Sequence, residues 1–254
     1  MATLFEAAGL QEKAPRPLAD RLRPVSLGEV VGQDHLLGEQ GMLSRMVKAG
    51  RLGSVIFWGP PGTGKTTVAR LLAEETDLHF EQLSAIQSGV ADLRKVFDAA
   101  RARRELGRGT LLFIDEIHRF NRSQQDSFLP YMEDGTVILV GATTENPSFE
   151  LNSALLSRAS VLTFKRLDEE SLKSLLARAE AHEGRKLPLT EDARAALIAM
   201  ADGDGRAVIT LAEDVWLAAA SGAKTPLDRE ALVALVQRRA PIYDKSQDGH
   251  YNLI

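Results

Sequence analysis

Short strand-like runs alternate with amphipathic stretches over the first two thirds of the chain. Apolar residues at helical spacing predict helices that begin near residues 65, 90, 123 and 152. The runs between them are short, which is typical of strands buried on both faces of a parallel sheet. They lie at 54–58, 79–83, 110–114, 137–140 and 161–164. The alternation predicts an α/β fold, with helices on both faces of a five-stranded parallel sheet.

The pattern changes after Lys165. No strand-like run follows as far as Arg239, and apolar residues recur instead at helical spacing. This predicts a small bundle of about four helices. Three residues stand before these helices as candidate N-caps, whose side-chain oxygens accept hydrogen bonds from the first helical turn: Asp168, Thr190 and Thr225.

These patterns divide the chain into four parts. We expect a flexible N-terminal tail over 1–20, an αβα domain over 21–166 and a helical domain over 167–240. The last stretch, 241–254, ends without a helix cap or a polar tail. We therefore expect it to be the start of a further C-terminal region.

Composition narrows the class of protein. The 254 residues are 44% hydrophobic and 26% charged, which is ordinary for a soluble globular protein. Cysteine is absent, which excludes a disulfide framework and a thiol nucleophile and fits a reducing, cytoplasmic compartment. No apolar stretch approaches the roughly 20 residues of a membrane-spanning helix, so no membrane partner is expected. The formal charge of −4 argues against a surface that binds nucleic acid throughout.

A phosphate-binding pattern, G-x-x-x-x-G-K-[ST], lies between the first predicted strand and the helix after it. Gly62 and Gly64 let backbone N–H groups turn toward phosphate oxygens, and the helix N-terminus attracts the same anion. Lys65 is placed to contact the β- and γ-phosphates, and Thr66 to bind Mg²⁺. The pattern predicts a site for ATP and Mg²⁺ that is formed by Gly59, Pro60, Pro61, Gly62, Thr63, Gly64, Lys65, Thr66 and Thr67.

Two adjacent acids follow the third predicted strand. Asp115 is expected to hold Mg²⁺ through water, and Glu116 is the candidate general base that polarises the attacking water. Two acids also commonly begin a helix, where its dipole favours negative charge. The phosphate-binding loop upstream favours the catalytic interpretation. An Asp followed by Glu also favours hydrolysis over phosphate transfer to a small molecule.

Polar residues follow the fourth predicted strand as well. Thr144 is the first candidate to hydrogen-bond the attacking water or the γ-phosphate, and Asn146 is the second. Such residues are also common in plain turns. An arginine that neutralises charge on the transferred phosphoryl group is expected too, but spacing alone does not single one out.

Four segments together resemble a known family. They are GPPGTGKTT at 59–67, FIDEIHRFNRSQQDSFLPYMEDG at 113–135, GATTENPSFELNSALLSR at 141–158 and PLADRLRPVSLGEVVGQDHLLG at 17–38. They resemble the AAA+ ATPases of the replication-associated recombination protein A type, also known as MgsA, which include the Werner-helicase-interacting proteins. The resemblance covers about residues 17–254.

The resemblance implies an AAA+ fold in which ATP binds between the αβα domain and a helical lid. Thr144 falls at the sensor 1 position. Arg158 is similar to the finger that contacts the ATP of a neighbouring subunit, and Arg206 to the lid arginine (sensor 2) that contacts ATP in its own subunit. Val30 and Val31 are the apolar residues that the resemblance places at the adenine.

The resemblance also implies partners. Members of the family are DNA-stimulated ATPases that act at stalled replication forks on single-stranded ends or gaps, and they engage single-strand-binding protein. We therefore expect a homo-oligomeric, nucleoid-associated Mg²⁺-ATPase. Family chains continue into a C-terminal helical domain that builds tetramers, so a stable tetramer is not expected of these residues alone.

Two alternatives remain open from the sequence. One is a clamp-loader-like or RuvB-like DNA motor subunit with the same fold. The other is an ATP-gated binding module in which hydrolysis is incidental. Glu116 argues against the second alternative, because a pure switch has less need of a carboxylate that activates water.

Overall fold

The computed structural model describes residues 16–237, which include a five-stranded sheet. All neighbouring strands are parallel, and the order across the sheet is β2-β3-β4-β1-β5. The strands are β1 (Val55–Trp58), β2 (His79–Ser84), β3 (Thr110–Asp115), β4 (Ile138–Thr143) and β5 (Ser160–Thr163). The predicted α/β fold is confirmed.

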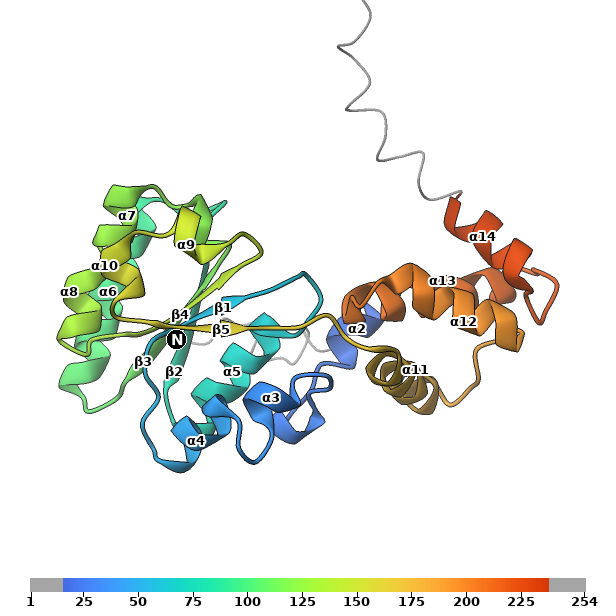
Figure 1. Cartoon of the computed structure of the whole chain (residues 1–254), viewed down its shortest axis with the longest axis horizontal. Coiled ribbons are helices and arrows are strands. Elements are labelled where there is room, and N and C mark those ends of the chain that lie inside the picture. The colour runs from blue at the N-terminus through green and yellow to red at the C-terminus, as the bar shows by residue number, and fades with distance from the viewer. Residues whose placement is uncertain (1–15, 238–254) are drawn as a thin grey trace, which may run out of the picture. The chain divides into compact units, whose positions relative to one another are not determined.

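Helices cover both faces of this sheet (Figure 1). One face carries α3 (Asp34–Leu37), α4 (Met42–Lys48) and α5 (Lys65–Glu75), preceded by the short helix η1 (Leu27–Glu29). The other face carries η2 (Ile117–Arg119), α6 (Val90–Glu105), α7 (Arg122–Asp126), α8 (Leu129–Glu133), α9 (Pro147–Glu150) and α10 (Ser153–Leu156).

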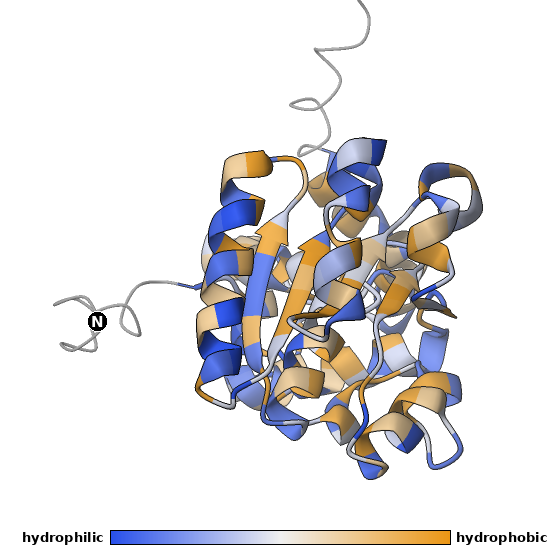
Figure 2. Ribbon diagram, turned by 90° about the vertical axis from the view of Figure 1, so that its left-hand side faces the viewer, coloured by the Kyte–Doolittle hydropathy of each residue, from blue (hydrophilic) through white to orange (hydrophobic). Residues whose placement is uncertain are grey.

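Alternation along the strands builds two separate cores. In β3, Leu111 and Phe113 pack with α4 and α5, whereas Leu112 and Ile114 pack with α6 and α10. All four side chains are fully buried. A strand that is apolar on both faces reads as a continuous hydrophobic run, which is why β3 could be recognised in the sequence. Figure 2 shows a mostly orange strand beside an outer strand that carries blue segments, with helices around them that carry both colours.

The single helix predicted to begin near residue 123 is instead two short helices, α7 and α8. Pro130 explains the break, because proline has no N–H to continue the hydrogen bonding of a preceding helix. It stands in the first turn of α8, where that N–H is not needed. Phe128, between the two helices, is fully buried and packs edge-to-face on Phe97 of α6.

The chain divides into two compact units. The α/β unit comprises Pro24–Ser174 and Ala201–Gly205, and the helical unit contains the other described residues. The remaining helices are α11 (Glu169–Glu183), α12 (Glu191–Ala201), α13 (Gly205–Ala220) and α14 (Arg229–Gln237). Among the described residues, no helix is long and apolar enough to span a membrane.

Two of the three predicted N-caps make the expected bonds. Asp168 accepts from the Ser171 amide at 2.8 Å, and Thr190 accepts from the Ala193 amide at 3.3 Å. Thr225 was a wrong choice. The last helix begins later, and Asp228 accepts from the Ala231 amide at its start. Asp is as suitable a cap residue as Thr, and Asp228 stands immediately before the first helical residue.

The described part of the expected N-terminal tail is ordered. Residues 16–23 belong to the helical unit and contain α2 (Leu18–Arg21). Leu18 is fully buried, and its amide donates to Glu213 at 3.2 Å. Arg21 pairs with Glu183 at 2.8 Å. The rest of the expected tail, and the C-terminal region expected at 241–254, lie outside the described residues.

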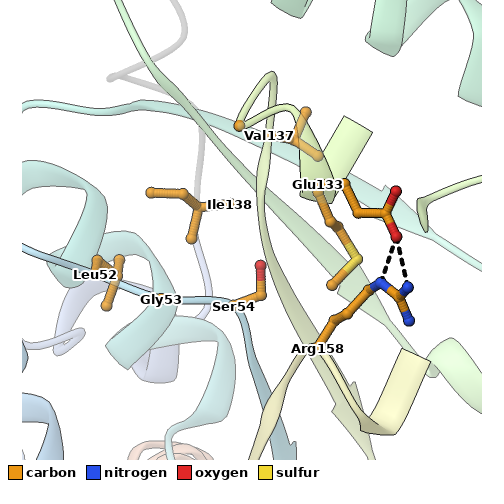
Figure 3. A pocket seen from close by; sticks show the side chains of 9 residues that line it. Leu52, Gly53, Ser54, Glu133, Val137, Ile138 and Arg158 are labelled. Carbon is orange, nitrogen blue, oxygen red and sulfur yellow. Dashed lines mark hydrogen bonds and ion pairs between the residues drawn. The ribbon is translucent and has the colours of Figure 1, made fainter. Parts of the chain in front are cut away.

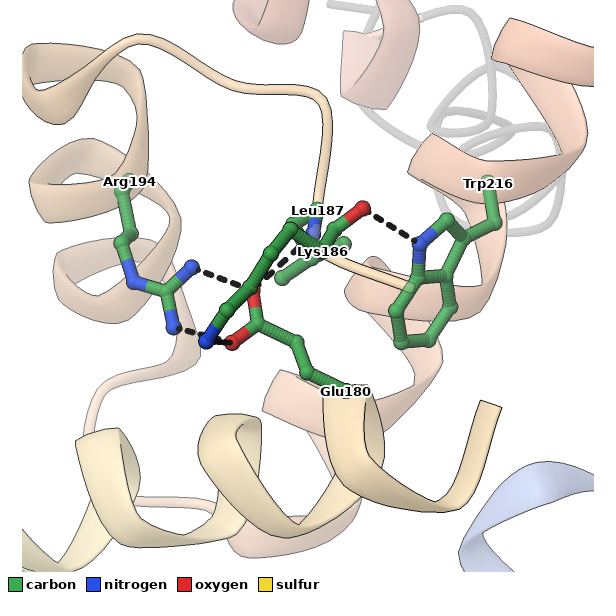
Figure 4. Close-up of polar contacts among 5 residues, drawn as sticks. All are labelled: Glu180, Lys186, Leu187, Arg194 and Trp216. Atoms are coloured by element: carbon green, nitrogen blue, oxygen red, sulfur yellow. Dashed lines mark hydrogen bonds and ion pairs between the residues drawn. The ribbon is translucent and has the colours of Figure 1, made fainter. Parts of the chain in front are cut away.

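A buried carboxylate fastens the loop between α11 and α12 (Figure 4). The side chain of Glu180 is only 3% exposed. Arg194 donates to it through two nitrogens at 2.7 and 3.3 Å, Lys186 at 3.1 Å, and the Leu187 amide at 2.9 Å. Burial by itself raises the pKa of Glu180, but these hydrogen bonds outweigh it and lower the pKa from 4.5 to about 2.

Replacing Glu180 by Gln is expected to destabilise the helical unit by about 3 kcal/mol, since Arg194 then lacks its counter-charge in a buried site. The lowered pKa also makes this stabilisation present above pH 4.5 and progressively lost as the pH falls toward about 2. Chemical unfolding followed by the fluorescence of Trp216, which donates to the Lys186 carbonyl, measures both effects.

The matched control is Glu170→Gln on the same helix, where the carboxylate is 81% exposed and pairs with Lys173. It is expected to change stability little. Equal stability of the Glu180 variant and the wild type between pH 4 and 7 would contradict the role given to Glu180.

Candidate functional site

Polar residues gather where the three central strands end. Strands β3, β4 and β1 are adjacent and parallel, so their carboxyl ends lie side by side at one edge of the sheet. The phosphate-binding loop follows β1, Asp115 ends β3, and Thr143 ends β4. This edge is where ligands bind in open parallel α/β sheets.

The phosphate-binding loop has the shape of an anion cradle. Gly62 and Gly64 have φ of 67° and 95°, a left-handed conformation that L side chains rarely adopt. Gly64 is the N-cap of α5, so the helix begins at Lys65 with its first amides at the loop. Successive amides at a helix N-terminus favour a bound phosphate. The loop therefore fits a nucleotide phosphate.

Side chains of the loop fasten its own backbone. Lys65 donates to the carbonyls of Gly59 and Pro60, both at 2.7 Å. Thr63 is 2% exposed and donates to the Pro60 carbonyl at 2.9 Å. The amine of Lys65 thus lies across the loop. When a nucleotide binds, it can donate its hydrogen bonds to phosphate oxygens in place of these two carbonyl oxygens.

The segment predicted at the adenine lies beside the loop. Cγ1 of Val30 is 3.8 Å from the place that a Cβ on Gly64 would take, and Val30 and Val31 are both half-buried. Fully buried Gln33 fixes this segment by bonding both the amide and the carbonyl of Lys165, at 3.1 and 2.8 Å. An apolar patch next to the loop suits a nucleotide base, so the placement of Val30 favours the prediction.

The candidate base stands on a strained turn. Glu116 has φ of 53°, an unusual backbone conformation for a residue with a side chain. Such outliers persist where the surrounding structure holds them, and they concentrate at functional sites. The turn brings Oε2 of Glu116 to 3.3 Å from Nδ1 of His118, whose side chain is only 7% exposed.

His118 in turn contacts β4. Its Nδ1 lies 2.9 Å from Oγ1 of Thr143, which also bonds the backbone of Glu145. Thr143 is 1% exposed, whereas Thr144 and Asn146 are exposed. Asn146 accepts from the Ser148 amide as the N-cap of α9. The residue of β4 that is joined to the acidic turn is therefore Thr143.

Sequence reasoning missed both His118 and this role of Thr143. The five histidines show no metal-ligand spacing, so spacing marks none of them as a site residue. The signal that was available is its place two residues after a candidate base, within the segment FIDEIHRFN. A buried imidazole against a carboxylate holds that carboxylate in one orientation.

The predicted Mg²⁺ ligands fit an ion that is shared with a nucleotide. Among the described residues, no group of three or more His, Cys, Asp or Glu side chains could hold a metal by itself. Mg²⁺ is commonly bound through one or two protein oxygens together with substrate phosphates and water. Thr66, at the start of α5, and half-buried Asp115 offer such oxygens.

Arg158 comes shortly before β5, near the strand ends opposite the phosphate-binding loop. Figure 3 shows its side chain beside that of Glu133. Its guanidinium donates to Glu133 at 2.6 Å, and also to the Ala154 carbonyl and the Ser157 hydroxyl. The side chain borders a pocket of about 310 Å³, which is lined by Leu52, Gly53, Ser54, Met132, Glu133, Gly135, Val137, Ile138 and Arg158.

Register separates Arg158 from the phosphate-binding loop of its own chain. Ser160 at the start of β5 pairs with Val55 at the start of β1, whereas the loop follows the end of β1. At ~3.3 Å per residue, β1 alone puts about 13 Å between the two ends. Arg158 therefore lies at the far end of β1 and β5 from its own loop. Arg206 is the second residue of α13 and belongs to the helical unit.

Two family descriptions match the sequence. "ATPase family associated with various cellular activities (AAA)" matches residues 55–167, which span β1 to the end of β5. "AAA C-terminal domain" matches residues 183–254.

Two relatives are similar along almost the whole chain. Replication-associated recombination protein A of Escherichia coli K12 is 44% identical over 247 residues, which are 94% of this chain and 55% of that protein. ATPase WRNIP1 of Dictyostelium discoideum is 39% identical over 266 residues, covering 96% of this chain and 30% of that protein. The chain spans about half the length of the bacterial relative.

Solved structures with the same fold include a DNA motor. The RuvB Holliday junction branch migration motor of Thermotoga maritima superposes with a TM-score of 0.70 at 27% identity. The superposition covers 85% of this chain and 72% of that one.

Proposed function

The chain belongs to the AAA family of ATPases, in the branch of replication-associated recombination protein A, and on that premise we propose that it hydrolyses ATP with Mg²⁺ to act on DNA at stalled replication forks. Its DNA would be a fork with a single-stranded end or a gap, its protein partner single-strand-binding protein, and its place in the cell the cytoplasm at the nucleoid. The working form would be a homo-oligomer, a tetramer where the full length of the relatives is present.

One observation carries the ATPase proposal. The chain of contacts from Glu116 through His118 to Thr143 holds a carboxylate at the sheet edge where the phosphate-binding loop also lies. A nucleotide-binding module without turnover needs the loop but not an oriented base beside it. This arrangement favours hydrolysis over the ATP-gated binding module.

The roles of the residues follow from their places. The nucleotide with Mg²⁺ supplies the phosphoryl group and a concentrated negative charge. Lys65 and the amides at the start of α5 offset that charge, and Thr66 and Asp115 offer oxygens to the metal. Glu116, oriented by His118, accepts a proton from the attacking water.

Three further residues complete the proposed site. Arg158 supplies positive charge to the site of a neighbouring subunit, and Arg206 supplies it within its own chain. For the hydrogen bond to the attacking water or the γ-phosphate, Thr143 is a better candidate than the exposed Thr144, because it contacts His118.

A DNA branch-migration motor is the second candidate function. It is supported by the structural similarity to RuvB at 27% identity. Two relatives named replication-associated recombination protein A are 44% and 50% identical, which favours the first proposal.

The test measures the ATPase rate per subunit against protein concentration, with and without forked DNA that carries a single-stranded end. We expect the rate to rise with concentration, because Arg158 must come from a neighbour, and to rise again with DNA. Four-way junctions and duplex DNA serve as comparison substrates.

Preferential stimulation by a four-way junction would replace the fork proposal by the branch-migration motor. A rate that ignores DNA at every concentration would contradict the DNA-coupled ATPase. The same assay on a chain extended to the length of the relatives shows whether assembly is the missing condition.

A further inference from the structure

A five-residue segment returns from the helical unit to the phosphate-binding loop. Ala201–Gly205 belongs to the α/β unit, although the residues before and after it belong to the helical unit. The Gly205 amide donates to the Gly62 carbonyl at 3.1 Å, and the Leu167 amide donates to the carbonyl of Gly203 at 3.0 Å. The segment is thus held against the loop by its backbone.

This segment places a carboxylate directly on the anion cradle. A Cβ built on Gly62 would overlap with the side-chain carboxylate of Asp204, so the carboxylate contacts the Gly62 backbone itself. Only glycine fits at this position, both because φ is 67° and because Asp204 fills the space. An acidic side chain is an unexpected neighbour for a loop that fits phosphate.

The contact fixes how near Asp204 would be to a bound phosphate. The carboxylate lies at van der Waals distance from the Gly62 Cα, the amide nitrogen is about 1.5 Å from that Cα, and a hydrogen-bonded phosphate oxygen is about 2.9 Å further. The two groups of oxygens are then at most about 8 Å apart. That is no more than a Debye length at physiological ionic strength, so salt leaves much of their repulsion in place.

We propose that Asp204 makes nucleotide binding depend on Mg²⁺, by weakening the binding of metal-free nucleotide more than that of the Mg²⁺ complex. The inference rests on the proposed function, because it takes residues 59–66 as the nucleotide site. ADP carries about three negative charges, and a bound Mg²⁺ cancels two of them. Repulsion from Asp204 therefore falls when the metal is present.

If Asp204 serves only as a helix cap, nucleotide binding is expected to respond differently to its replacement. Asp204 stands immediately before α13, and Asp is a preferred N-cap residue. Asn caps a helix about as well as Asp does, so Asp204→Asn keeps any capping and removes only the charge. If capping were its whole role, this variant would bind nucleotide like the wild type, with and without metal.

The experiment is calorimetric titration of the full chain with ADP, in Mg²⁺ and in excess EDTA. ADP is used because it is not consumed during the titration. Asp204→Asn is expected to bind metal-free ADP about tenfold more tightly than the wild type, and Mg²⁺-ADP about threefold more tightly. The ratio of the Kd for metal-free ADP to the Kd for Mg²⁺-ADP is thus expected to be about threefold smaller in the variant than in the wild type.

The control is Asp202→Asn in the same segment. Asp202 pairs with Arg166, its side chain is 78% exposed, and its φ of 47° suits Asn equally well. It is expected to leave both Kd values unchanged. Equal tightening in the two variants would show an effect of net charge and would overturn the proposal, as would an unchanged Mg²⁺ dependence in Asp204→Asn.

Two further variants guard against a folding defect. Asp204→Ser is neutral and also caps helices, so it is expected to reproduce Asp204→Asn. Asp204→Glu keeps the charge and is expected to retain the wild-type dependence on Mg²⁺. If the wild type itself fails to bind ADP, the proposed function fails; if it binds and the neutral variants match it, only the role of Asp204 fails.

Discussion

Replacing Glu116 by Gln is expected to lower the turnover of ATP at least about 100-fold while ATP binding is retained, since positioned general bases contribute roughly 10²–10⁴ in rate. The amide has nearly the same shape as the carboxylate and can still contact His118, but it cannot accept a proton from water. Removing a negative charge near the phosphates does not weaken binding. Phosphate release measures turnover, and equilibrium titration with ATP measures binding.

Glu145→Gln is the matched control for this variant. Glu145 lies at the same edge of the sheet, and its side chain is exposed. Its backbone, not its carboxylate, bonds to Thr143. We expect this control to hydrolyse ATP like the wild type. Unchanged turnover in Glu116→Gln would remove Glu116 as the base, and loss of ATP binding would mean that its carboxylate holds the loop instead.

Replacing Arg158 by Ala is expected to lower hydrolysis about 10³-fold without weakening ATP binding, because an arginine supplied by a neighbour contributes roughly 10³–10⁵ in rate. Arg158 and the phosphate-binding loop of the same chain stand at opposite ends of β1 and β5, so under the proposed function the arginine acts on the loop of a neighbouring subunit. Steady-state kinetics at high protein concentration measures the loss.

Mixing tests whether the site is shared between subunits. Lys65→Ala subunits lack a working loop but keep Arg158, and Arg158→Ala subunits have the reverse defect. In an equal mixture, about a quarter of the interfaces join an intact loop to an intact arginine, if assembly is random in a head-to-tail ring. We therefore expect up to about a quarter of the wild-type rate to return on mixing, and no recovery would count against a shared site.

Glu133 provides a control for the surroundings of Arg158. Glu133→Gln removes the carboxylate that pairs with the guanidinium but keeps the arginine. An exposed ion pair is worth up to about 1 kcal/mol, so hydrolysis is expected to stay within about fivefold of the wild type. A loss as large as that of Arg158→Ala would mean that the pair, and not a free arginine, is what the active form requires.

Features set by residues close together in the chain could be predicted from the sequence. The loop 59–66 needs glycines, a lysine and a threonine at fixed spacing between a strand and a helix, and all of these are local. The buried strand that leads to Asp115 is a continuous apolar run because helices cover both of its faces. The fold and the acidic pair therefore followed from pattern alone.

The choice between Thr143 and Thr144 required the strand itself. Side chains alternate between the faces of a strand, so an error of one residue reverses which of two neighbours points inward. The apolar run suggested that the strand ends at 140, but β4 continues to Thr143. Backbone pairing with β1 extends β4 by three polar or small residues that hydrophobicity did not mark.

What the sequence by itself determined is the phosphate-binding loop, the acidic pair and the five-stranded sheet that carries them, because these depend on local spacing and apolar periodicity. Only the tertiary structure decided which groups contact them. His118 contacts Glu116 because the backbone makes a left-handed turn at Glu116, and Asp204 contacts Gly62, from which it is separated by 142 positions in the chain. Such contacts arise when separate segments close over one another. The spacing of residues along a chain does not encode which distant side chain fills the space above a glycine.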